Sequence, residues 1–301
     1  MKRGWAQWAE YAGIRLASAL LGALPRRAAM ALAWGVGGAY YWLNRRLRGR
    51  TRRRIREALG KEVSEQEVCR IGRIAFRNLV FMAVEGMRFP RMGMGEASAA
   101  VDFDGLEGMR TELAKGRGLI VALPHLGNWE MAGMALQARG IGVVTLARRQ
   151  RNVWTNDWIG RIRARTGMEA IDTRSRAIGG VAEKLNPGGK VLAILPDVRA
   201  KIGGVPVKFL GAETQLPGGL AKFARETGAA IATAEGERKG WMRHEWRLTG
   251  KVESDLSLEA TTDRRRIMQY VAERFEQSVR EHPESYFWFN PRWVLGAEAK
   301  K

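Results

Sequence analysis

The stretch "GLIVALPHLGNWEMAG", residues 118–133, decides the predicted fold. It begins with a short apolar run typical of a buried β-strand, and Pro124 and His125 end that run. Gly127 permits a sharp turn, Asn128 is a favourable N-cap, and Glu130 falls in the first turn of the helix that follows. The order strand, turn, helix is the repeating unit of an α/β sheet.

Other segments repeat this pattern along the chain. The expected strands are "GLIVAL" (118–123), "GVVTLA" (142–147), "KVLAIL" (190–195) and "AAIATA" (229–234), and the expected helices cover 129–138, 154–166, 176–186, 217–227 and 263–281. Buried strands that alternate with helices indicate a sheet covered on both faces. We therefore predict an α/β fold with a central, mostly parallel or mixed sheet flanked by helices.

The first sixty residues differ in composition from the rest. They contain two uncharged apolar runs, 16–25 and 28–43, and several aromatic residues of the kind that favours bilayer interfaces: Trp5, Trp8, Trp34, Tyr40, Tyr41 and Trp42. The second run would be roughly 24 Å long as a helix, shorter than a hydrocarbon core of roughly 30 Å. We predict that residues 1–60 are a membrane anchor that lies in the bilayer or crosses it shallowly, and that residues 61–301 are the α/β domain. The alternative is a pair of core helices.

Charge points to an anionic partner. The formal net charge is +20, and eight of the twelve residues from Arg45 to Arg56 are arginine. Such a field suits an anionic membrane surface or nucleic acid. The membrane is favoured because the cluster follows the apolar runs directly, and no nucleic-acid recognition motif accompanies it. Cys69 is the single cysteine, which excludes an internal disulfide and a cysteine-based metal site.

His125 and Glu130 form the candidate chemical pair. On one continuous helix, residues five apart would point about 140° away from each other. On a strand, turn and helix they can face the same space at the carboxyl end of the strand, where open α/β sheets bind ligands. A carboxylate that fixes the imidazole tautomer lets the other nitrogen take a proton from a substrate hydroxyl.

Taken together, these motifs resemble the lipid A biosynthesis acyltransferases, a family of late acyltransferases within the lysophospholipid acyltransferase-like group. The resemblance rests on "HLGNWE" (125–130), "ARRQRN" (147–152), the Pro-Asp segment that begins "LPDVRAK" at 195, the loop "VPVKFLGAETQLPGG" (205–219) and "YFWFNPRW" (286–293). It covers about residues 5–295. The fold that it implies is like that of glycerol-phosphate acyltransferases.

The resemblance implies a role for each matching residue. His125 is the expected catalytic base and Glu130 its supporting acid. Arg148 and Asn152 are expected to bind the substrate, with the arginine suited to a phosphate, and Asp197 is expected to orient an arginine or to bond a sugar. Val207, Phe209 and Leu210 either line an acyl channel or pack beneath it. No metal or cofactor is expected.

The implied reaction transfers a fatty acyl chain from an acyl carrier protein or coenzyme A thioester to a hydroxyl of a phosphorylated lipid A precursor. The expected location is the bacterial inner membrane, with the catalytic domain on its cytoplasmic face. Two alternatives remain at this point. The acceptor could be another glycolipid or aminolipid, as for phosphatidylinositol mannoside acyltransferases, or the chain could be a non-catalytic nucleic-acid-binding protein.

Overall fold

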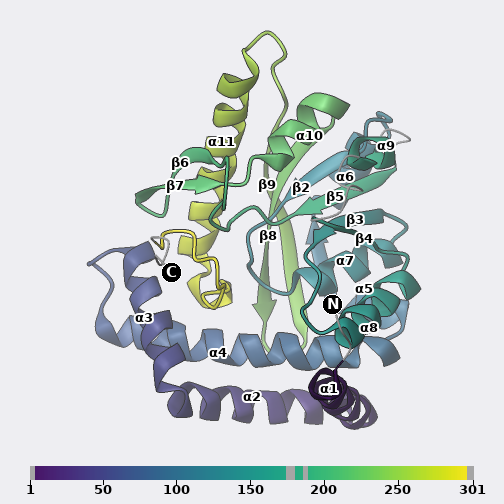
Figure 1. The fold of residues 1–301 in the computed structure, drawn as a ribbon, viewed down its shortest axis with the longest axis vertical. Coiled ribbons are helices and arrows are strands. Elements are labelled where there is room, and N and C mark those ends of the chain that lie inside the picture. The colour runs from purple at the N-terminus through teal and green to yellow at the C-terminus, as the bar shows by residue number, and fades with distance from the viewer. Residues whose placement is uncertain (1–3, 174–179, 186–188, 297–301) are drawn as a thin grey trace.

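A mixed seven-stranded sheet is the centre of this computed structural model, which describes residues 4–173, 180–185 and 189–296 (Figure 1). The strand order is β1-β9-β8-β2-β5-β3-β4. The strands are β1 (Val101–Asp104), β2 (Leu119–Ala122), β3 (Gly142–Ala147), β4 (Glu169–Asp172), β5 (Lys190–Ile194), β8 (Ala230–Lys239) and β9 (Arg243–Val252). The predicted α/β fold and its four strands are confirmed.

Most of this sheet is parallel. β8, β2, β5, β3 and β4 run in one direction, and β9 returns antiparallel to β8 as a long hairpin. All the parallel strands therefore end at the same edge, where loops can bring side chains from distant parts of the chain together. A separate antiparallel hairpin consists of β6 (Val205–Phe209) and β7 (Ala212–Leu216).

Alternate residues of the central strands enter two different cores. Leu119, Val121 and Val143 face one side, and Ile120 and Leu192 face the other. The first face is covered by α5 (Met94–Ala99), α6 (Leu106–Leu113) and α7 (Trp129–Ala138), and the second by α9 (Val181–Leu185), α10 (Gly219–Thr227) and α11 (Ala260–Glu281). α8 (Val153–Arg165) lies beside β4. α9 is the described part of the helix predicted over 176–186, and residues 176–179 and 186 lie outside the described residues.

The N-terminal residues form four helices at one end of the sheet. They are α1 (Trp5–Ala23), α2 (Arg26–Leu43), α3 (Arg45–Leu59) and α4 (Glu65–Arg88). α2 lies along α4, with α1 beside them (Figure 1). A Cβ at Gly37 would meet the Cα of Arg77 at 2.7 Å, so this glycine permits the close approach of α2 and α4.

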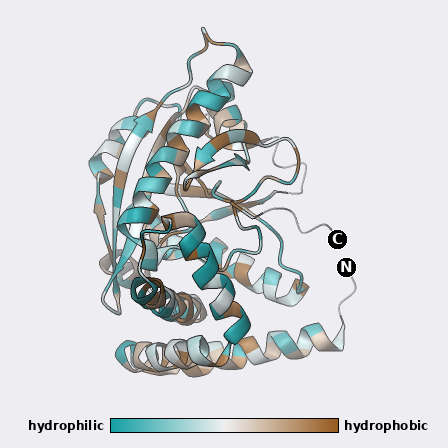
Figure 2. Ribbon diagram, turned by 90° about the vertical axis from the view of Figure 1, so that its left-hand side faces the viewer, coloured by the Kyte–Doolittle hydropathy of each residue, from teal (hydrophilic) through white to brown (hydrophobic). Residues whose placement is uncertain are grey.

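The apolar side chains of α1 and α2 divide between a small core and the surface. Ala29, Met30 and Ala33 pack against Phe81 and Val84 of α4. Many others are exposed: Trp5, Trp8, Leu16, Leu20, Leu24, Leu32, Trp34, Val36, Tyr40, Trp42 and Leu43. Figure 2 shows hydrophobic residues, in brown, along the lowest helices. Within the described ranges, no helix is both long enough and apolar enough to cross a bilayer. The predicted domain boundary after residue 60 stays a prediction.

Candidate active site

His125 and Asp197 are brought together by the register of two neighbouring parallel strands. Ala122 of β2 pairs with Ile194 of β5, and each of the two polar residues comes three positions later. The Nδ1 of His125 lies 2.6 Å from Oδ1 of Asp197, and the backbone N–H of His125 donates to Oδ2 at 2.8 Å. The pair therefore lies at the carboxyl edge of the sheet, where the sequence placed the site.

Asp197 is buried, whereas the His125 side chain keeps 20% of its surface exposed. With the carboxylate at Nδ1, the proton is held on that nitrogen and Nε2 is left as an acceptor. Burial, and then the charge of Asp197, raise the pKa of Tyr286 well above its usual value, so the Tyr286 hydroxyl stays protonated beside the carboxylate. The arrangement is that of a histidine base with an oriented tautomer.

The C-terminal segment holds the loop that carries His125. The backbone N–H of Phe287 donates to the carbonyl of His125 at 2.7 Å, and that of Gly127 donates to the carbonyl of Ser285 at 3.0 Å. Gly127 has a φ of +68°, and a Cβ there would meet the carbonyl oxygen of Gly236 at 2.6 Å. Only glycine fits both constraints without displacing the loop.

Arg54 fixes this C-terminal segment to α3. Its guanidinium donates to the carbonyl of Trp288 at 2.6 Å and lies over the ring of Trp293. Burial, and then the charge of Arg50, lower the pKa of Arg54 to about 10. One member of the arginine cluster is thus a buried structural residue, whereas Arg45, Arg46, Arg50, Arg53 and Arg56 are exposed.

The predicted contact between His125 and Glu130 is corrected by the structure. Glu130 begins α7 and points toward Arg163 of α8, whose Nε donates to Oε2 at 3.2 Å and whose terminal nitrogen donates to Oε1. The acid that the sequence placed five residues after His125 is therefore neutralised by an arginine. The acid bonded to His125 is Asp197, to which the sequence had given a different role.

A shared local pattern could have indicated this pair. Both residues follow a buried strand and a Leu-Pro dipeptide, "ALPH" at 122–125 and "ILPD" at 194–197. Equal offsets from adjacent parallel strands place two side chains side by side. The sequence carried no comparable signal for Tyr286, whose hydroxyl approaches Asp197 from the far end of the chain.

Arg148 and Asn152, both expected to bind the substrate, have different environments. Arg148 follows β3 at the same edge and is exposed, so it is free to meet a ligand. Asn152 is buried and caps α8, because its Oδ1 accepts from the backbone N–H groups of Trp154 and Thr155. Its Nδ2 donates to the carbonyl of Gln7 at 2.7 Å in α1. The geometry gives Asn152 a structural role in place of the predicted substrate contact.

A buried polar cluster lies behind the catalytic loop. Glu85 of α4 accepts bonds from Arg238 of β8 and from the Nδ2 of Asn128 at 2.8 Å, and its Oε1 lies 3.2 Å from the Nε2 of His244. Burial would raise the pKa of Glu85, but the charge of Arg238 and the bond with His244 lower it to about 2. The Oδ1 of Asn128 caps α7 through Met131, so this cluster links α4 to the loop that starts the helix.

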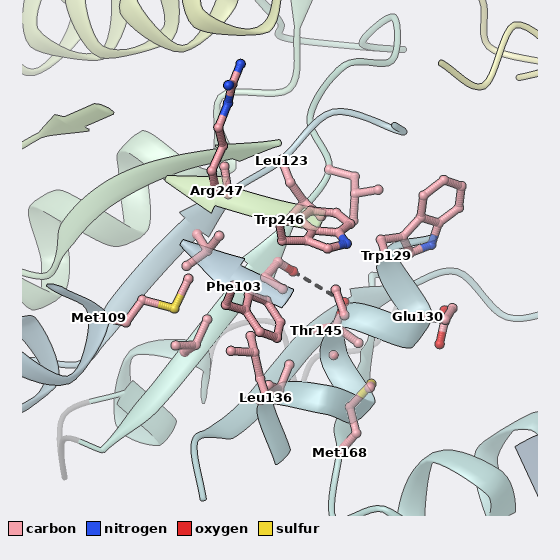
Figure 3. Close-up of a pocket in the computed structure, with 18 of the residues that line it drawn as sticks. Phe103, Met109, Leu123, Trp129, Glu130, Leu136, Thr145, Met168, Trp246 and Arg247 are labelled. Carbon is pink, nitrogen blue, oxygen red and sulfur yellow. Dashed lines mark hydrogen bonds between the residues drawn. The ribbon is translucent and has the colours of Figure 1, made fainter. Parts of the chain in front are cut away.

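An apolar pocket lies on the α7 face of the sheet, and Trp129, which contacts His125, lines it (Figure 3). It lies between β-strands and α7 and is partly open to solvent. Its walls include Phe103, Met109, Val121, Leu123, Trp129, Leu136, Val143, Met168 and Trp246, and Glu130 lies at its rim. The Trp129 ring is 5.0 Å from that of His125, so the base stands behind one wall of this pocket.

The loop 205–219 does not supply this pocket. Val207 and Phe209 belong to β6, which packs against α11 in the core on the opposite face of the sheet. Leu210 is buried in the same core. Of the two roles open for these three residues, packing is the one that the structure shows.

One cluster of described residues has the composition of a metal site. Ligand atoms of Glu235, Glu281 and His282 lie within 4.8 Å of one another. However, Arg247 donates to both carboxylates, which supplies the positive charge that a cation would otherwise provide.

Comparison with known proteins gives the fold and site their context. Residues 2–294 match the family model described as bacterial lipid A biosynthesis acyltransferase. The chain is 29% identical over 221 residues to a protein named phosphatidylinositol mannoside acyltransferase from Mycobacterium tuberculosis (strain CDC 1551 / Oshkosh), a match that covers 70% of this chain and 66% of the relative. A protein of the same name from Mycolicibacterium smegmatis is 28% identical over 218 residues, which cover 70% of this chain and 68% of the relative. The match of the family model to nearly the whole chain shows that the protein belongs to the bacterial lipid A biosynthesis acyltransferase family.

Proposed function

We propose that this protein is a membrane-associated O-acyltransferase that moves a fatty acyl chain from a thioester donor to a hydroxyl of a glycolipid. The observation that carries the proposal is the His125–Asp197 pair, whose Nε2 has no hydrogen-bond partner among the described residues, behind a wall of an apolar pocket. Among the described residues, no serine, threonine or cysteine hydrogen-bonds the His125 ring, and such a base suits direct attack by a substrate hydroxyl. An apolar pocket suits the acyl chain, because burial of each CH₂ group contributes about 0.8 kcal/mol.

The transfer follows from these positions. His125 Nε2 takes the proton of the acceptor hydroxyl as its oxygen attacks the thioester carbonyl carbon. The tetrahedral oxyanion collapses, the carbon–sulfur bond breaks, and the imidazolium returns the proton to the leaving thiolate. The products are an ester and a free thiol. Asp197 stabilises the imidazolium between the two proton transfers.

Two comparisons indicate different acceptors. The family description favours a phosphorylated lipid A precursor, whereas the names of the mycobacterial relatives favour a phosphatidylinositol mannoside. Both carry phosphate and sugar hydroxyls, which Arg148 at the sheet edge could bind by bidentate contacts. The family match also favours an enzyme over the nucleic-acid binder.

We place the enzyme on the cytoplasmic face of the bacterial inner membrane. The exposed apolar side chains of α1 and α2 would enter the interface, and the exposed arginines of α3 would meet anionic headgroups at about 1 kcal/mol each. Sedimentation with vesicles checks this proposal. We expect binding to phosphatidylglycerol vesicles that weakens with salt and when Trp34 and Trp42 are replaced by alanine. If the same amount of protein sedimented with and without vesicles, the proposed membrane binding would be contradicted.

Purified protein tests the reaction itself. Acyl-coenzyme A and acyl carrier protein thioesters are each offered with a lipid A precursor and with a phosphatidylinositol mannoside, and products are identified by mass spectrometry. We expect one acceptor to gain a single acyl chain while free thiol appears in equal amount. Thiol release without an acylated acceptor would show a thioesterase in place of a transferase.

A further inference from the structure

Trp246 presents a buried hydrogen-bond donor to the apolar pocket. The residue is 5% exposed, and its Nε1 has no acceptor among the described residues. The surrounding wall is made of Leu123, Trp129 and other apolar side chains. A buried N–H without a partner is unfavourable, so natural proteins seldom keep one unless another molecule completes it.

Strand register puts this indole level with the catalytic base. Thr233 of β8 pairs with Ala122 of β2. Three positions further along each chain segment, His125 comes level with Gly236. The β8–β9 pairing has an irregularity between Thr233 and Ala234. Gly236 pairs with Trp246 across the β8–β9 hairpin. Trp246 therefore starts two strands away from β2, a lateral offset of roughly 10 Å that a tryptophan side chain partly spans.

Its ring extends over β8 toward the catalytic loop. A Cβ on Gly236 would lie 2.1 Å from Cε2 of Trp246, the atom bonded to Nε1, so the ring covers this glycine. The carbonyl of Gly236 meets Gly127 of the loop. In Figure 3 the indole nitrogen lies on the side that faces Trp129, the residue whose ring contacts His125.

An acyl donor brings few oxygen atoms into such a pocket. When a saturated chain occupies the pocket, the carbonyl oxygen of the thioester is bonded to the carbon that is attacked. That carbon must lie close to His125 for the reaction to occur. A donor fixed at this point needs no reorganisation as negative charge develops on the oxygen.

We propose that the indole N–H of Trp246 donates a hydrogen bond to the thioester carbonyl oxygen and then to the oxyanion formed by attack. Trp246 is thus a catalytic residue that touches the reacting atoms, and the buried donor is completed only when the acyl group is bound. The proposal rests on the acyl-transfer function given above.

The variant Trp246→Phe keeps an aromatic ring and removes the donor. We expect kcat to fall about 10²-fold, the usual effect of losing one oxyanion donor. Trp158→Phe is the matched control, because Trp158 is similarly buried at 8% exposure but lies in α8. Trp246→Phe should lower Tm no more than this control, since the donor that it removes is unpaired in the free protein. A second variant, Gly236→Ala, would displace the indole and should also reduce kcat.

Two unreactive analogues give a readout independent of turnover. One is an acyl-coenzyme A ketone, with CH₂ in place of sulfur, and the other is a thioether that lacks the carbonyl oxygen. The intact protein should bind the ketone about tenfold more tightly than the thioether, the size expected for one hydrogen bond, and Trp246→Phe should bind both alike.

The outcomes distinguish the proposed role of Trp246 from the proposed acyl-transfer function. If the intact protein transfers acyl chains and Trp246→Phe does so equally fast, the role of Trp246 is overturned and the function stands. If the intact protein neither transfers acyl chains nor binds either analogue, the acyl-transfer function itself fails. Equal preference for the ketone in both proteins would also overturn the role of Trp246.

Discussion

Two histidines of this protein each lie against a carboxylate, but their surroundings differ. His125 bonds Asp197 through Nδ1 at the sheet edge, and its side chain keeps 20% of its surface exposed. His244 lies against Glu85, is fully buried, and its Nδ1 has no partner among the described residues. Burial lowers the pKa of His244, despite the nearby Glu85 charge. The same pair of groups can thus serve either proton transfer or packing.

The second nitrogen of the imidazole decides between these roles. A base must accept a proton from something outside the pair, so its free nitrogen has to reach a ligand. His125 meets that requirement, whereas His244 is enclosed between α4 and the β8–β9 hairpin. Distance to a carboxylate alone does not distinguish the two.

Replacing each histidine by alanine tests this comparison most severely. We expect His125→Ala to reduce kcat about 10³-fold or more with little change in Tm, because it removes the base from a partly exposed position. His244→Ala should lower Tm through the cavity it leaves, while kcat of the folded fraction stays within about tenfold. Thermal melts and acyl-transfer assays on both variants check this. The reverse pattern would assign the base to the wrong histidine.

Replacing the two candidate acids sharpens the assignment at His125. Asp197→Asn keeps the shape but lets the imidazole adopt the wrong tautomer, so we expect kcat to fall about 10²- to 10³-fold. Glu130→Gln removes an acid that bonds Arg163, and its effect should fall mainly on stability, by about 1 kcal/mol. A larger loss of kcat in Glu130→Gln would restore the pair that the sequence suggested.

These acids also show where inference from the sequence ended. The pattern around residues 118–133 predicted the strand, the turn, the N-cap Asn128 and the helix, all of which depend on local propensity. It could place His125 at the sheet edge, but the partner depends on strand order. β5 lies next to β2, and this neighbour relation brings Asp197 to the imidazole from 72 residues away.

The missed strands have a similar cause. β1 and β9 carry many charged residues, as in "VDFD" and "RHEWRLTGKV", so an apolar run does not mark them. β1 is the edge strand and β9 its neighbour, and one face of each is open enough to tolerate polar side chains. Trp246 was therefore not predicted as a pocket residue, because its strand, β9, was not predicted.

Lowering the pH tests the buried pair, His244 and Glu85. The pKa of Glu85 is lowered from 4.5 to about 2, so its contribution to stability is complete above pH 4.5 and is lost as the pH falls toward 2. The lowered pKa of His244 acts in the same direction below pH 6.5, because the unfolded chain then binds the proton more readily. We expect Glu85→Gln to lower the free energy of unfolding at pH 7 by about 3 kcal/mol and to flatten its decline between pH 4.5 and 2.

Asp263→Asn is the matched control for that experiment. Asp263 is fully buried between Arg225 and Arg266, on the far side of the sheet from the pocket. Both variants should have a lower free energy of unfolding than the intact protein. Urea unfolding at several pH values measures this free energy for each variant. A stability curve of Glu85→Gln that runs parallel to that of the intact protein below pH 4.5 would contradict the lowered pKa of Glu85.

The smallest expected effect distinguishes Arg148 from Asn152, which were both predicted to bind the substrate. Asn152→Ala removes the cap of α8 and the bond to Gln7, so we expect a loss of about 1 kcal/mol and an unchanged KM for the acceptor. Asn152→Ser should recover most of that stability, since serine also caps helices. Arg148→Ala should leave Tm unchanged and raise KM, because its exposed guanidinium is available to a substrate phosphate. If Asn152→Ala raised KM without lowering Tm, Asn152 would be a substrate ligand and α8 would not depend on its cap.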